Sequence, residues 1–373
     1  MIVGIVVAVV IAVLVFAIAQ PGTDQDQPVF HPVYLVLAAG VSLSFLTGDL
    51  FNLFVAFEMM LTASYILITL GGREDQVQTG MTYVVINLVA STLFVVALAL
   101  VYASTGTVNM ADLATKIPAL PGGLRGALVL LLFVVFGIKA AIFPLYFWLP
   151  DSYPTAPTAV TAVFAGLLTK VGVYCLLRTQ TLFVPAGDRR PALIATVAGL
   201  TMVVGVLGAV AQHDMKRILS FHIVSQIGYM ILGLALYTVA GLAASIVYLV
   251  NQVVLKSSLL LVAGIVDHGA GSSRLSRVGG LARRFPVVGW LFLLPALSLA
   301  GIPPFSGFVA KLAVVQAAAD HRWWVPMGVA IGVGVLTLFS YWVTSSESWA
   351  AESATSRSLQ RRSPRTCARV SST

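Results

Sequence analysis

Charged residues are scarce in this chain of 373 residues. Only 10% are Asp, Glu, Lys or Arg and 58% are hydrophobic, whereas an ordinary soluble domain has about 25% charged residues. So few charged groups cannot cover the surface of a protein of this length in water. The composition therefore excludes a water-soluble enzyme or binding domain and predicts that most of the chain lies in a lipid bilayer.

The sequence also has little of what metal, redox and hydrolytic chemistry needs. Its two cysteines, Cys175 and Cys367, give neither a disulfide framework nor a metal-ligand spacing. No glycine-rich nucleotide loop follows a strand, and no Ser-His-Asp arrangement can be argued. The formal net charge is +8, but five of the 22 basic residues lie in the last 17 positions and four lysines lie inside apolar segments. No basic stripe interleaved with aromatics remains. We therefore predict no cofactor, no metal, no nucleic-acid partner and no enzymatic function.

Long hydrophobic runs dominate what is present. With roughly 20 apolar residues per membrane-spanning helix, the sequence predicts an all-α, polytopic membrane helix bundle of about eleven spans. The spans lie near residues 1–19, 33–48, 50–70, 81–103, 125–149, 156–178, 191–211, 218–237, 241–266, 286–318 and 323–343. We interpret the first as a span because it lacks a basic N-terminal region, although Ala17-Ile18-Ala19 keeps a cleaved signal peptide as the alternative. Basic residues divide almost evenly between the two sets of loops, but the arginine-rich tail falls on the same side as the end of the first span, so we place that end in the cytoplasm.

Residues 1–343 are predicted to form one membrane-embedded translocation domain. Residues 344–373 change to a Ser- and Arg-rich composition, which predicts a polar, disordered tail.

Two of the predicted spans are interrupted by proline and glycine. One break runs from Phe143-Pro144 to Pro157, and the other runs from Gly301 to Gly307. Proline removes a backbone donor and blocks a carbonyl, so such breaks belong beside cavities or ion paths in a membrane protein. Each break also has a lysine within a few residues, which is the pattern that inverted repeats leave in transporters. An ordinary proline kink is the alternative for either break alone.

The strongest functional signal is charge inside the apolar spans, at Glu58, Lys139, Lys170, Lys256 and Lys311. Each such group costs roughly 2.5–3.5 kcal/mol at the centre of a bilayer on insertion scales, so these side chains must face the bundle interior, form pairs or contact water. A carboxylate that approaches a buried ammonium favours its protonated form. We therefore hypothesise that Glu58 alternately approaches and leaves Lys139 as a proton switch. For Lys170, Lys256 and Lys311, extension of the side chain to a headgroup is the alternative.

Polar side chains also recur on neighbouring helical faces. His222, Gln226 and Tyr229 share one face, and Gln252 and Lys256 repeat the spacing of four in the next span. These stripes fit a hydrogen-bonded water chain, with His222 as a relay because imidazole titrates near neutrality. Interhelical packing hydrogen bonds are the alternative for the uncharged residues.

Four sequence blocks resemble one family. The stretch from Thr47 to Glu58 is similar to the D subunit of the Mrp-type cation/proton antiporters. The blocks at residues 139–157, 222–229 and 301–311 resemble the wider superfamily, which includes proton-translocating subunits of respiratory complex I and membrane hydrogenases. Asp49, within the first block, suits either a helix cap or a cation guide.

The resemblance implies roles for the buried charges. Glu58 would be the acid of a key ion pair with Lys139 on a discontinuous helix, and Lys170 the connecting relay. Lys311 would lie on a second discontinuous helix, and His222 and Lys256 on the central polar axis. The implied fold has two inverted repeats, and the implied activity exchanges protons for Na⁺ or K⁺ within a multisubunit complex of the cell membrane.

Two alternatives stay open. The chain could be a proton-pumping membrane subunit of a complex I or hydrogenase-like redox complex, such as an NADH-quinone oxidoreductase. It could also be an inactive fragment, because compared with the family it begins near the third span and ends in an unrelated tail. A truncated or frameshifted gene would produce such an end.

Overall fold

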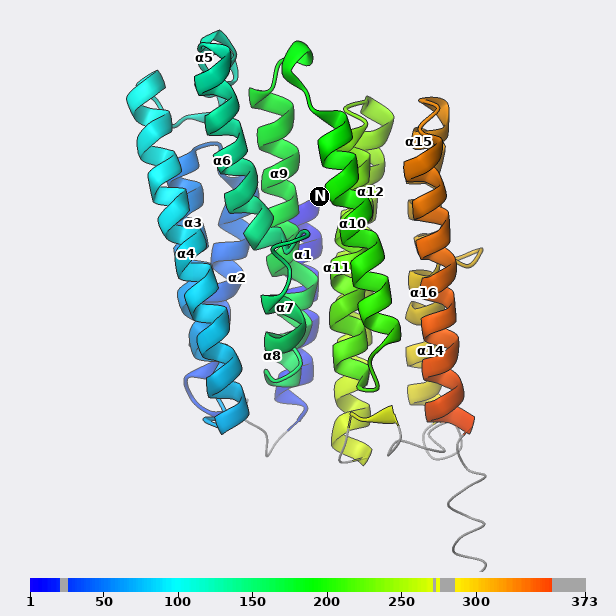
Figure 1. The fold of residues 1–373 in the computed structure, drawn as a ribbon. Helices are drawn as coiled ribbons and strands as arrows, with labels where there is room; N and C mark the ends of the chain where they lie inside the picture. The colour runs from blue at the N-terminus through cyan, green and yellow to red at the C-terminus, as the bar shows by residue number, and fades with distance from the viewer. Residues whose placement is uncertain (21–25, 271–272, 276–285, 351–373) are drawn as a thin grey trace, which may run out of the picture.

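The computed structural model describes residues 1–20, 26–270, 273–275 and 286–350, and this part of the chain is an all-α bundle (Figure 1). Within it, eight helices are long and apolar enough to cross a membrane. They are α3 (Leu50–Ile68), α4 (Glu74–Thr105), α6 (Gly122–Ala140), the continuous run of α8 (Thr158–Val163), η2 (Phe164–Leu168) and α9 (Thr169–Phe183), α10 (Pro191–Val210), α11 (Met215–Ala235), α12 (Val239–Ala270) and α16 (Trp324–Ala350).

Three shorter apolar helices complete the set of predicted spans: α1 (Ile2–Ile18), α2 (Phe30–Leu46) and α14 (Pro286–Ala300). Each of the predicted runs therefore coincides with an apolar helix, which confirms the all-α polytopic fold. The structure adds α5 (Met110–Ala119), a short helix at one end of the bundle that the sequence did not predict (Figure 1). Helix α16 continues past residue 343 to Ala350, and the rest of the predicted tail lies outside the described residues.

The centre of the bundle is formed by the α8–η2–α9 run and by α11. In the most apolar 18-residue stretch of each, 94% of the residues are buried, whereas the corresponding shares are 39% for α4 and 28% for α16. The outer helices present exposed Val and Leu side chains, such as Val85, Leu88 and Val89 of α4, as expected where lipid is the solvent. Polar side chains on the central helices therefore lie inside the protein.

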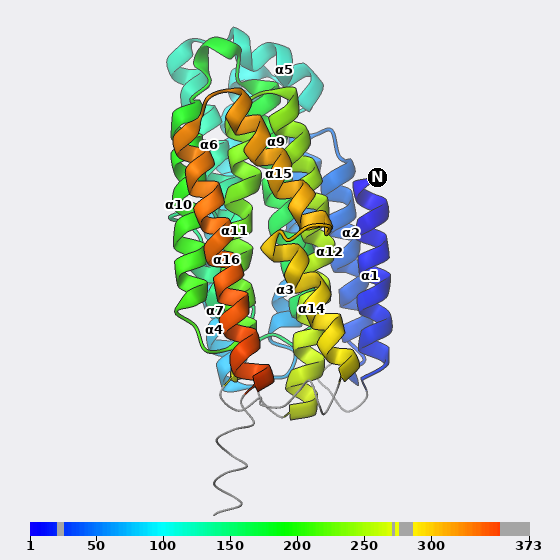
Figure 2. The ribbon, with the colours of Figure 1, turned by 90° about the vertical axis from the view of Figure 1, so that its right-hand side faces the viewer.

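Two spans are discontinuous, as predicted. Helix α6 ends at Ala140, and α7 (Trp148–Ser152) continues it after a turn in which Ala141 has a left-handed φ of 57°. Helix α14 ends at Ala300, and α15 (Ser306–Asp320) follows a turn in which Gly301 has a φ of 86°. Figure 2 shows α14 and α15 as separate segments that meet midway along the bundle.

The two breaks have the same backbone hydrogen bonds. Ile142 N donates to Gly137 O and Ile302 N donates to Leu297 O, both at 3.1 Å. Farther along, Leu145 N donates to Ile142 O (2.6 Å) and Phe305 N donates to Ile302 O (3.1 Å). The breaks are therefore equivalent features of a structural repeat and not two independent proline kinks.

A second repeated feature shows that the repeats are inverted. Asp49 pairs with Asn109 in an isolated antiparallel bridge, and Asp214 pairs with Arg274 in the same way. The bridges have matching backbone bonds: Leu50 N to Val108 O (2.9 Å) with Met110 N to Gly48 O (2.8 Å), and Met215 N to Ser273 O (3.0 Å) with Leu275 N to His213 O (3.1 Å). The first bridge adjoins α5, and the second lies at the opposite end of the bundle, where α11 begins (Figure 1).

Candidate functional site

Buried lysines run through the interior of the bundle. Lys139, Lys170 and Lys256 are 4%, 1% and 0% exposed, and Lys311 is partly buried. Lys170 and Lys256 do not reach the protein surface as extension to a headgroup requires. Among the described residues, none of these four lysines has a carboxylate as an ion-pair partner.

Lys139 lies in the last turn of α6, just before the first break. Its ammonium donates to the side-chain Oδ1 of Asn87 (3.3 Å) and to the Asn87 carbonyl (3.5 Å) on α4. It also lies 5.6 Å from the ring centroid of Phe57 on α3, within cation–π range. Gly172 of α9 makes this packing possible, since a Cβ there would lie 2.5 Å from Ala140 N.

Glu58 is on α3, one residue after Phe57. Its Oε1 is buried and accepts no hydrogen bond in the described structure. No direct ion pair joins Glu58 to Lys139 in the part of the chain that the structure describes, although the ammonium lies beside Phe57, the residue next to Glu58. The predicted partners are thus near each other and separated, with Lys139 held by Asn87 instead.

Asn87 is a site residue that was not predicted from the sequence. Its signal there is a single amide within a long apolar span, which is also common in interhelical packing. Its Nδ2 donates to Tyr83 O (2.9 Å), and this bond orients Oδ1 toward the lysine.

Lys170 follows a π-helical turn. Residues Phe164–Leu168 form η2 within the α8–α9 span, and the Lys170 ammonium donates to Ala165 O of that turn. A π turn shifts the backbone hydrogen-bond register, which is frequent at functional sites. The neighbouring Thr169 hydroxyl is buried without a partner in the described structure.

Lys256 lies on α12 and reaches toward α11, where its ammonium donates to Leu219 O (3.4 Å). The next residue, Ser257, faces the π turn: its hydroxyl donates to Ala162 O (3.1 Å), and a Cβ on Gly166 would lie 2.1 Å from its Oγ. This close approach places Lys170 and Lys256 on adjoining helices.

Lys311 of α15 folds back onto the second break, where Gly301 is the left-handed residue. The Lys311 ammonium donates to Ala300 O (2.8 Å), the last carbonyl of α14, where the helix dipole favours a cation. It lies 5.6 Å from the ring centroid of Tyr229 on α11. The side chain passes over Gly301, where a Cβ would lie 2.8 Å from Lys311 Cδ.

His222 lies on α11 and faces α16. Its Nε2 is 3.2 Å from Ser340 Oγ, and its ring stacks on Tyr341 with centroids 4.9 Å apart. Its Nδ1 is buried without a hydrogen-bond partner in the described residues. Lys256 and Lys311 also contact α11, at Leu219 O and at the Tyr229 ring, so the three groups are arranged around one helix.

The remaining polar residues divide between two roles. Gln226 accepts from Tyr248 while its Nε2 is unsatisfied, and Gln252 Oε1 is buried and unsatisfied in the described structure, so both can bind water. Ser225 donates to Met202 O (3.0 Å), an interhelical packing bond. Asp49 caps α3 by accepting from Phe51 N and Asn52 N, which favours the cap over a cation guide.

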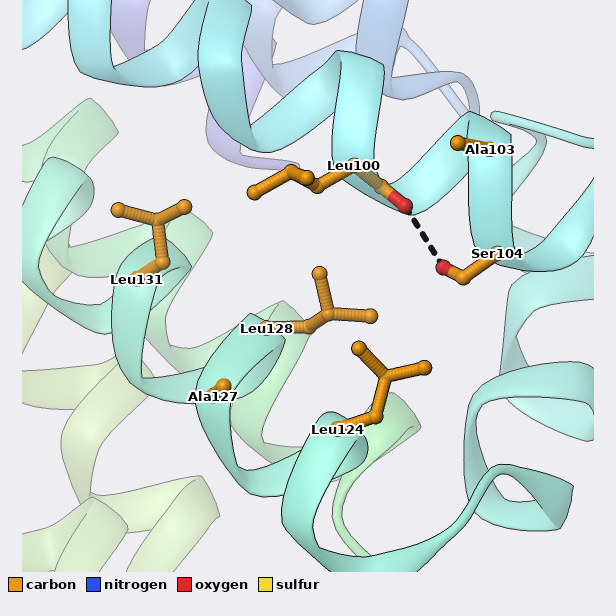
Figure 3. Close-up of a pocket in the computed structure, with 7 residues that line it drawn as sticks. All are labelled: Leu100, Ala103, Ser104, Leu124, Ala127, Leu128 and Leu131. Atoms are coloured by element: carbon orange, nitrogen blue, oxygen red, sulfur yellow. Dashed lines mark hydrogen bonds between the residues drawn. The ribbon is translucent and has the colours of Figure 1, made fainter.

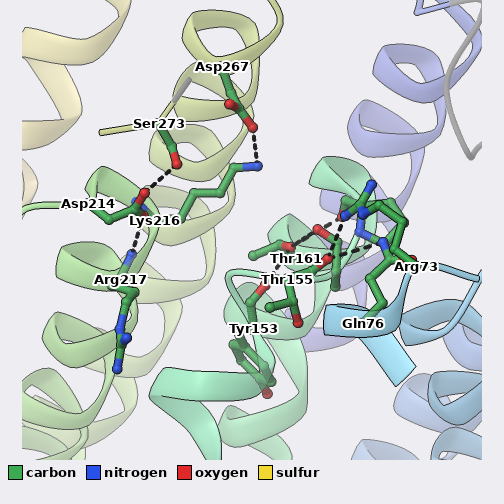
Figure 4. A network of polar contacts seen from close by, with 12 residues as sticks. Arg73, Gln76, Tyr153, Thr155, Thr161, Asp214, Lys216, Arg217, Asp267 and Ser273 are labelled. Atoms are coloured by element: carbon green, nitrogen blue, oxygen red, sulfur yellow. Dashed lines mark hydrogen bonds and ion pairs between the residues drawn. The ribbon is translucent and has the colours of Figure 1, made fainter. Parts of the chain in front are cut away.

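A charged cavity opens at the end of the bundle where α11 begins. It has a volume of about 1060 Å³ and is lined by both basic and acidic side chains. Figure 4 shows Lys216 paired with Asp267 (2.5 Å) and Asp214 accepting from Ser273. The apolar pattern of the sequence leaves the segment from Asp214 to Arg217 outside the span, as a polar loop that sets topology. Instead, Asp214 caps α11, and Lys216 is a buried residue of that helix.

An apolar groove between α4 and α6 is shown in Figure 3. It is lined by Leu and Ala side chains, with one hydroxyl, that of Ser104, bonded to Leu100 O (2.7 Å). Such a surface suits contact with lipid or a neighbouring helix and offers nothing that could handle an ion.

Comparisons with known proteins find this architecture elsewhere. Residues 47–338 match the family model described as NADH:quinone oxidoreductase/Mrp antiporter, TM. The D subunit of the Na(+)/H(+) antiporter of Alkalihalophilus pseudofirmus is 49% identical over 329 residues, covering 88% of this chain and 67% of that protein. A chain in the structure of the Mrp complex from a Dietzia species has 38% identity and a TM-score of 0.87, covering 93% of this chain and 66% of that chain.

A more distant likeness is to a chain of the membrane-bound sulfane sulfur reductase, an archaeal respiratory membrane complex. It has 26% identity and a TM-score of 0.86, and the match covers 96% of this chain and 76% of that chain. The chain thus spans about two thirds of the length of the Alkalihalophilus antiporter protein and of the Mrp complex chain.

Proposed function

The chain belongs to the NADH:quinone oxidoreductase/Mrp antiporter transmembrane family, and we propose that it is the proton-translocating subunit of a multisubunit antiporter that exchanges protons for Na⁺ or K⁺. Its partners are then the other subunits of the complex, and its place is the cell membrane. The observation that carries the proposal is the series of buried lysines without carboxylate partners in the described residues. An ammonium held only by neutral groups can release its proton, whereas one in a tight ion pair keeps it.

In the proposed switch, Asn87 and Glu58 compete for Lys139. The ammonium now donates to the two oxygens of Asn87, and Glu58 Oε1, which accepts no hydrogen bond from the described residues, can receive it. When Lys139 turns to Glu58, the carboxylate stabilises the charged lysine, and when it returns to Asn87, release of the proton is favoured.

In the proposed relay, the released proton passes to Lys170, Lys256, Lys311 and His222. Each lysine is held by a backbone carbonyl: Ala165 O, Leu219 O and Ala300 O respectively. Because like charges disfavour one another, protonation of one lysine promotes proton loss from the next. The unsatisfied amides of Gln226 and Gln252 supply positions for intervening water.

A second candidate function is proton pumping in a redox complex, in which a reaction in other subunits supplies the energy. The likeness to a chain of an archaeal respiratory complex favours it, because the same lysine series would serve both activities. The higher identity to the Alkalihalophilus antiporter protein favours the antiporter.

Everted membrane vesicles test the choice between these functions. The chain, expressed with its antiporter partners in cells without other antiporters, is expected to release a respiration-generated proton gradient when Na⁺ or K⁺ is added. Acridine orange fluorescence reports this release, with choline as the control cation. Proton movement that ignores both cations and follows only quinone turnover would instead establish the redox function.

A further inference from the structure

The charged cavity at the start of α11 is lined in part by two residues that do not belong to the proposed relay. Lys216 and Asp267 line it and form an ion pair with Nζ and Oδ2 2.5 Å apart. The Lys216 side chain is 11% exposed and that of Asp267 is 32% exposed. The lysine thus forms the inner part of the pair, and the carboxylate faces the cavity.

A second ion pair, which joins the cavity-lining Arg217 to Asp151 outside the lining, provides a contrast. Arg217 and Asp151 are 2.8 Å apart, but their side chains are 45% and 60% exposed. Exposed pairs of this kind contribute roughly 0–1 kcal/mol, because water screens them. Removing one partner of a mostly buried pair costs far more free energy, because the remaining charge is left buried without a counter-charge.

Directly inward from the pair lies Lys256. Asp267, Ala263, Leu260 and Lys256 follow one another on a single face of α12 at helical spacing. That face is turned to α11, because the Lys256 ammonium reaches Leu219 O, three residues from Lys216. Leu260 and Ala263 are each 1% exposed. Two buried apolar residues therefore separate the cavity from Lys256, and the ion pair lies between these residues and the cavity.

The fold itself does not require this pair. The matching bridges at Asp49 and Asp214 align α3 with α11, so that Phe51 and Tyr102 are the first-repeat counterparts of Lys216 and Asp267. These two side chains are 55% and 59% exposed on the outer surface. The first repeat folds in the same way without an ion pair at this place. Packing of the two helices therefore does not require the Lys216–Asp267 pair.

We propose that the Lys216–Asp267 ion pair is a gate between the charged cavity and the buried Lys256. With the pair closed, cavity water does not reach the face of α12 that carries Lys256. When the pair separates, Lys216 turns into the cavity and water enters between α11 and α12, so that a proton can be exchanged with Lys256. The transport role of the gate rests on the proposed function, but its sealing of the cavity can be measured without transport.

Thiol accessibility tests the seal. Cys175 and Cys367 are replaced by alanine, and a thiol is introduced behind the gate by Ala263→Cys in the assembled complex. A membrane-impermeant methanethiosulfonate reagent should modify this thiol slowly when the pair is intact. Asp267→Ala or Lys216→Ala should accelerate modification about tenfold or more, equivalent to about 1.4 kcal/mol lost from the closed state.

Three matched variants complete the experiment. Ala211→Cys lines the cavity and is exposed, so it should react rapidly in every background, which shows assembly and identifies the side of the membrane. Ala244→Cys is equally buried on α12 but distant from the gate, and should stay unreactive. Asp151→Ala, which breaks the exposed pair, should leave the Ala263→Cys thiol protected.

Unchanged reactivity of the Ala263→Cys thiol in both gate variants, with Ala211→Cys still reactive, overturns the gate. Rapid reaction with the pair intact overturns it as well. If a single gate variant fails to assemble, the exchange Lys216→Asp with Asp267→Lys decides, because a gate predicts restored protection. Failure of cation transport in the intact complex, with sealing as expected, would instead contradict the proposed function and leave the gate standing.

Discussion

At the scale of single residues, the four lysines of the proposed relay have neutral partners in the described structure. Lys139 is bound by Asn87, and Lys170, Lys256 and Lys311 by backbone carbonyls. The positions of these lysines could be predicted from sequence because charge inside an apolar run is costly enough to be conspicuous. Asn87 could not, since a neutral amide costs less to bury and serves packing equally well.

Asn87→Leu tests whether Asn87 competes with Glu58 for Lys139. A hydrogen bond to a charged group contributes roughly 1.5–3 kcal/mol, so its loss should bias Lys139 toward Glu58 and slow proton flux by roughly tenfold or more. Cation-dependent flux in vesicles, normalised to the amount of assembled complex, measures the effect. Thr92→Val, an exposed hydroxyl change on the same helix, is the matched control. Equal flux in both variants would remove Asn87 from the switch.

At the scale of elements, breaks and caps position the site. The Pro/Gly breaks could be predicted because proline excludes a continuous helix. The π turn Phe164–Leu168 could not, since a single glycine, Gly166, inside an apolar run does not distinguish a π turn from an α-helix. Lys216 was misplaced for a similar reason: the Asp214 cap starts α11 earlier than the apolar pattern indicates.

Substitutions at the two left-handed positions, Ala141 and Gly301, test whether the second break needs glycine because Lys311 packs over it. Gly301→Ala should destabilise the complex, because a left-handed alanine costs roughly 1–2 kcal/mol and its Cβ would lie 2.8 Å from Lys311 Cδ. The mirror change, Ala141→Gly, relieves a left-handed alanine and should be neutral or stabilising. Thermal unfolding of the complex in detergent compares them. Equal effects of the two changes would contradict the assigned packing of Lys311 over Gly301.

At the scale of the whole molecule, the membrane spans could be predicted from the hydrophobic pattern alone. Every predicted span has an apolar helix at its place, since a bilayer leaves the backbone few other options. The meeting of distant residues could not be obtained in this way. The contact of Lys139 with Asn87, and the ion pair of Lys216 with Asp267, depend on which helices are neighbours, and hydropathy does not contain that information.

The central claim is that protons pass between the buried charges of this bundle. It is tested most directly by cation-dependent proton flux in everted vesicles that carry Glu58→Ala or Lys139→Ala in the assembled complex. Lys116→Ala, which removes an exposed lysine of α5, is the matched control. The account predicts that both interior variants assemble normally and lose the flux while the control keeps it. Wild-type flux in both interior variants would contradict the account.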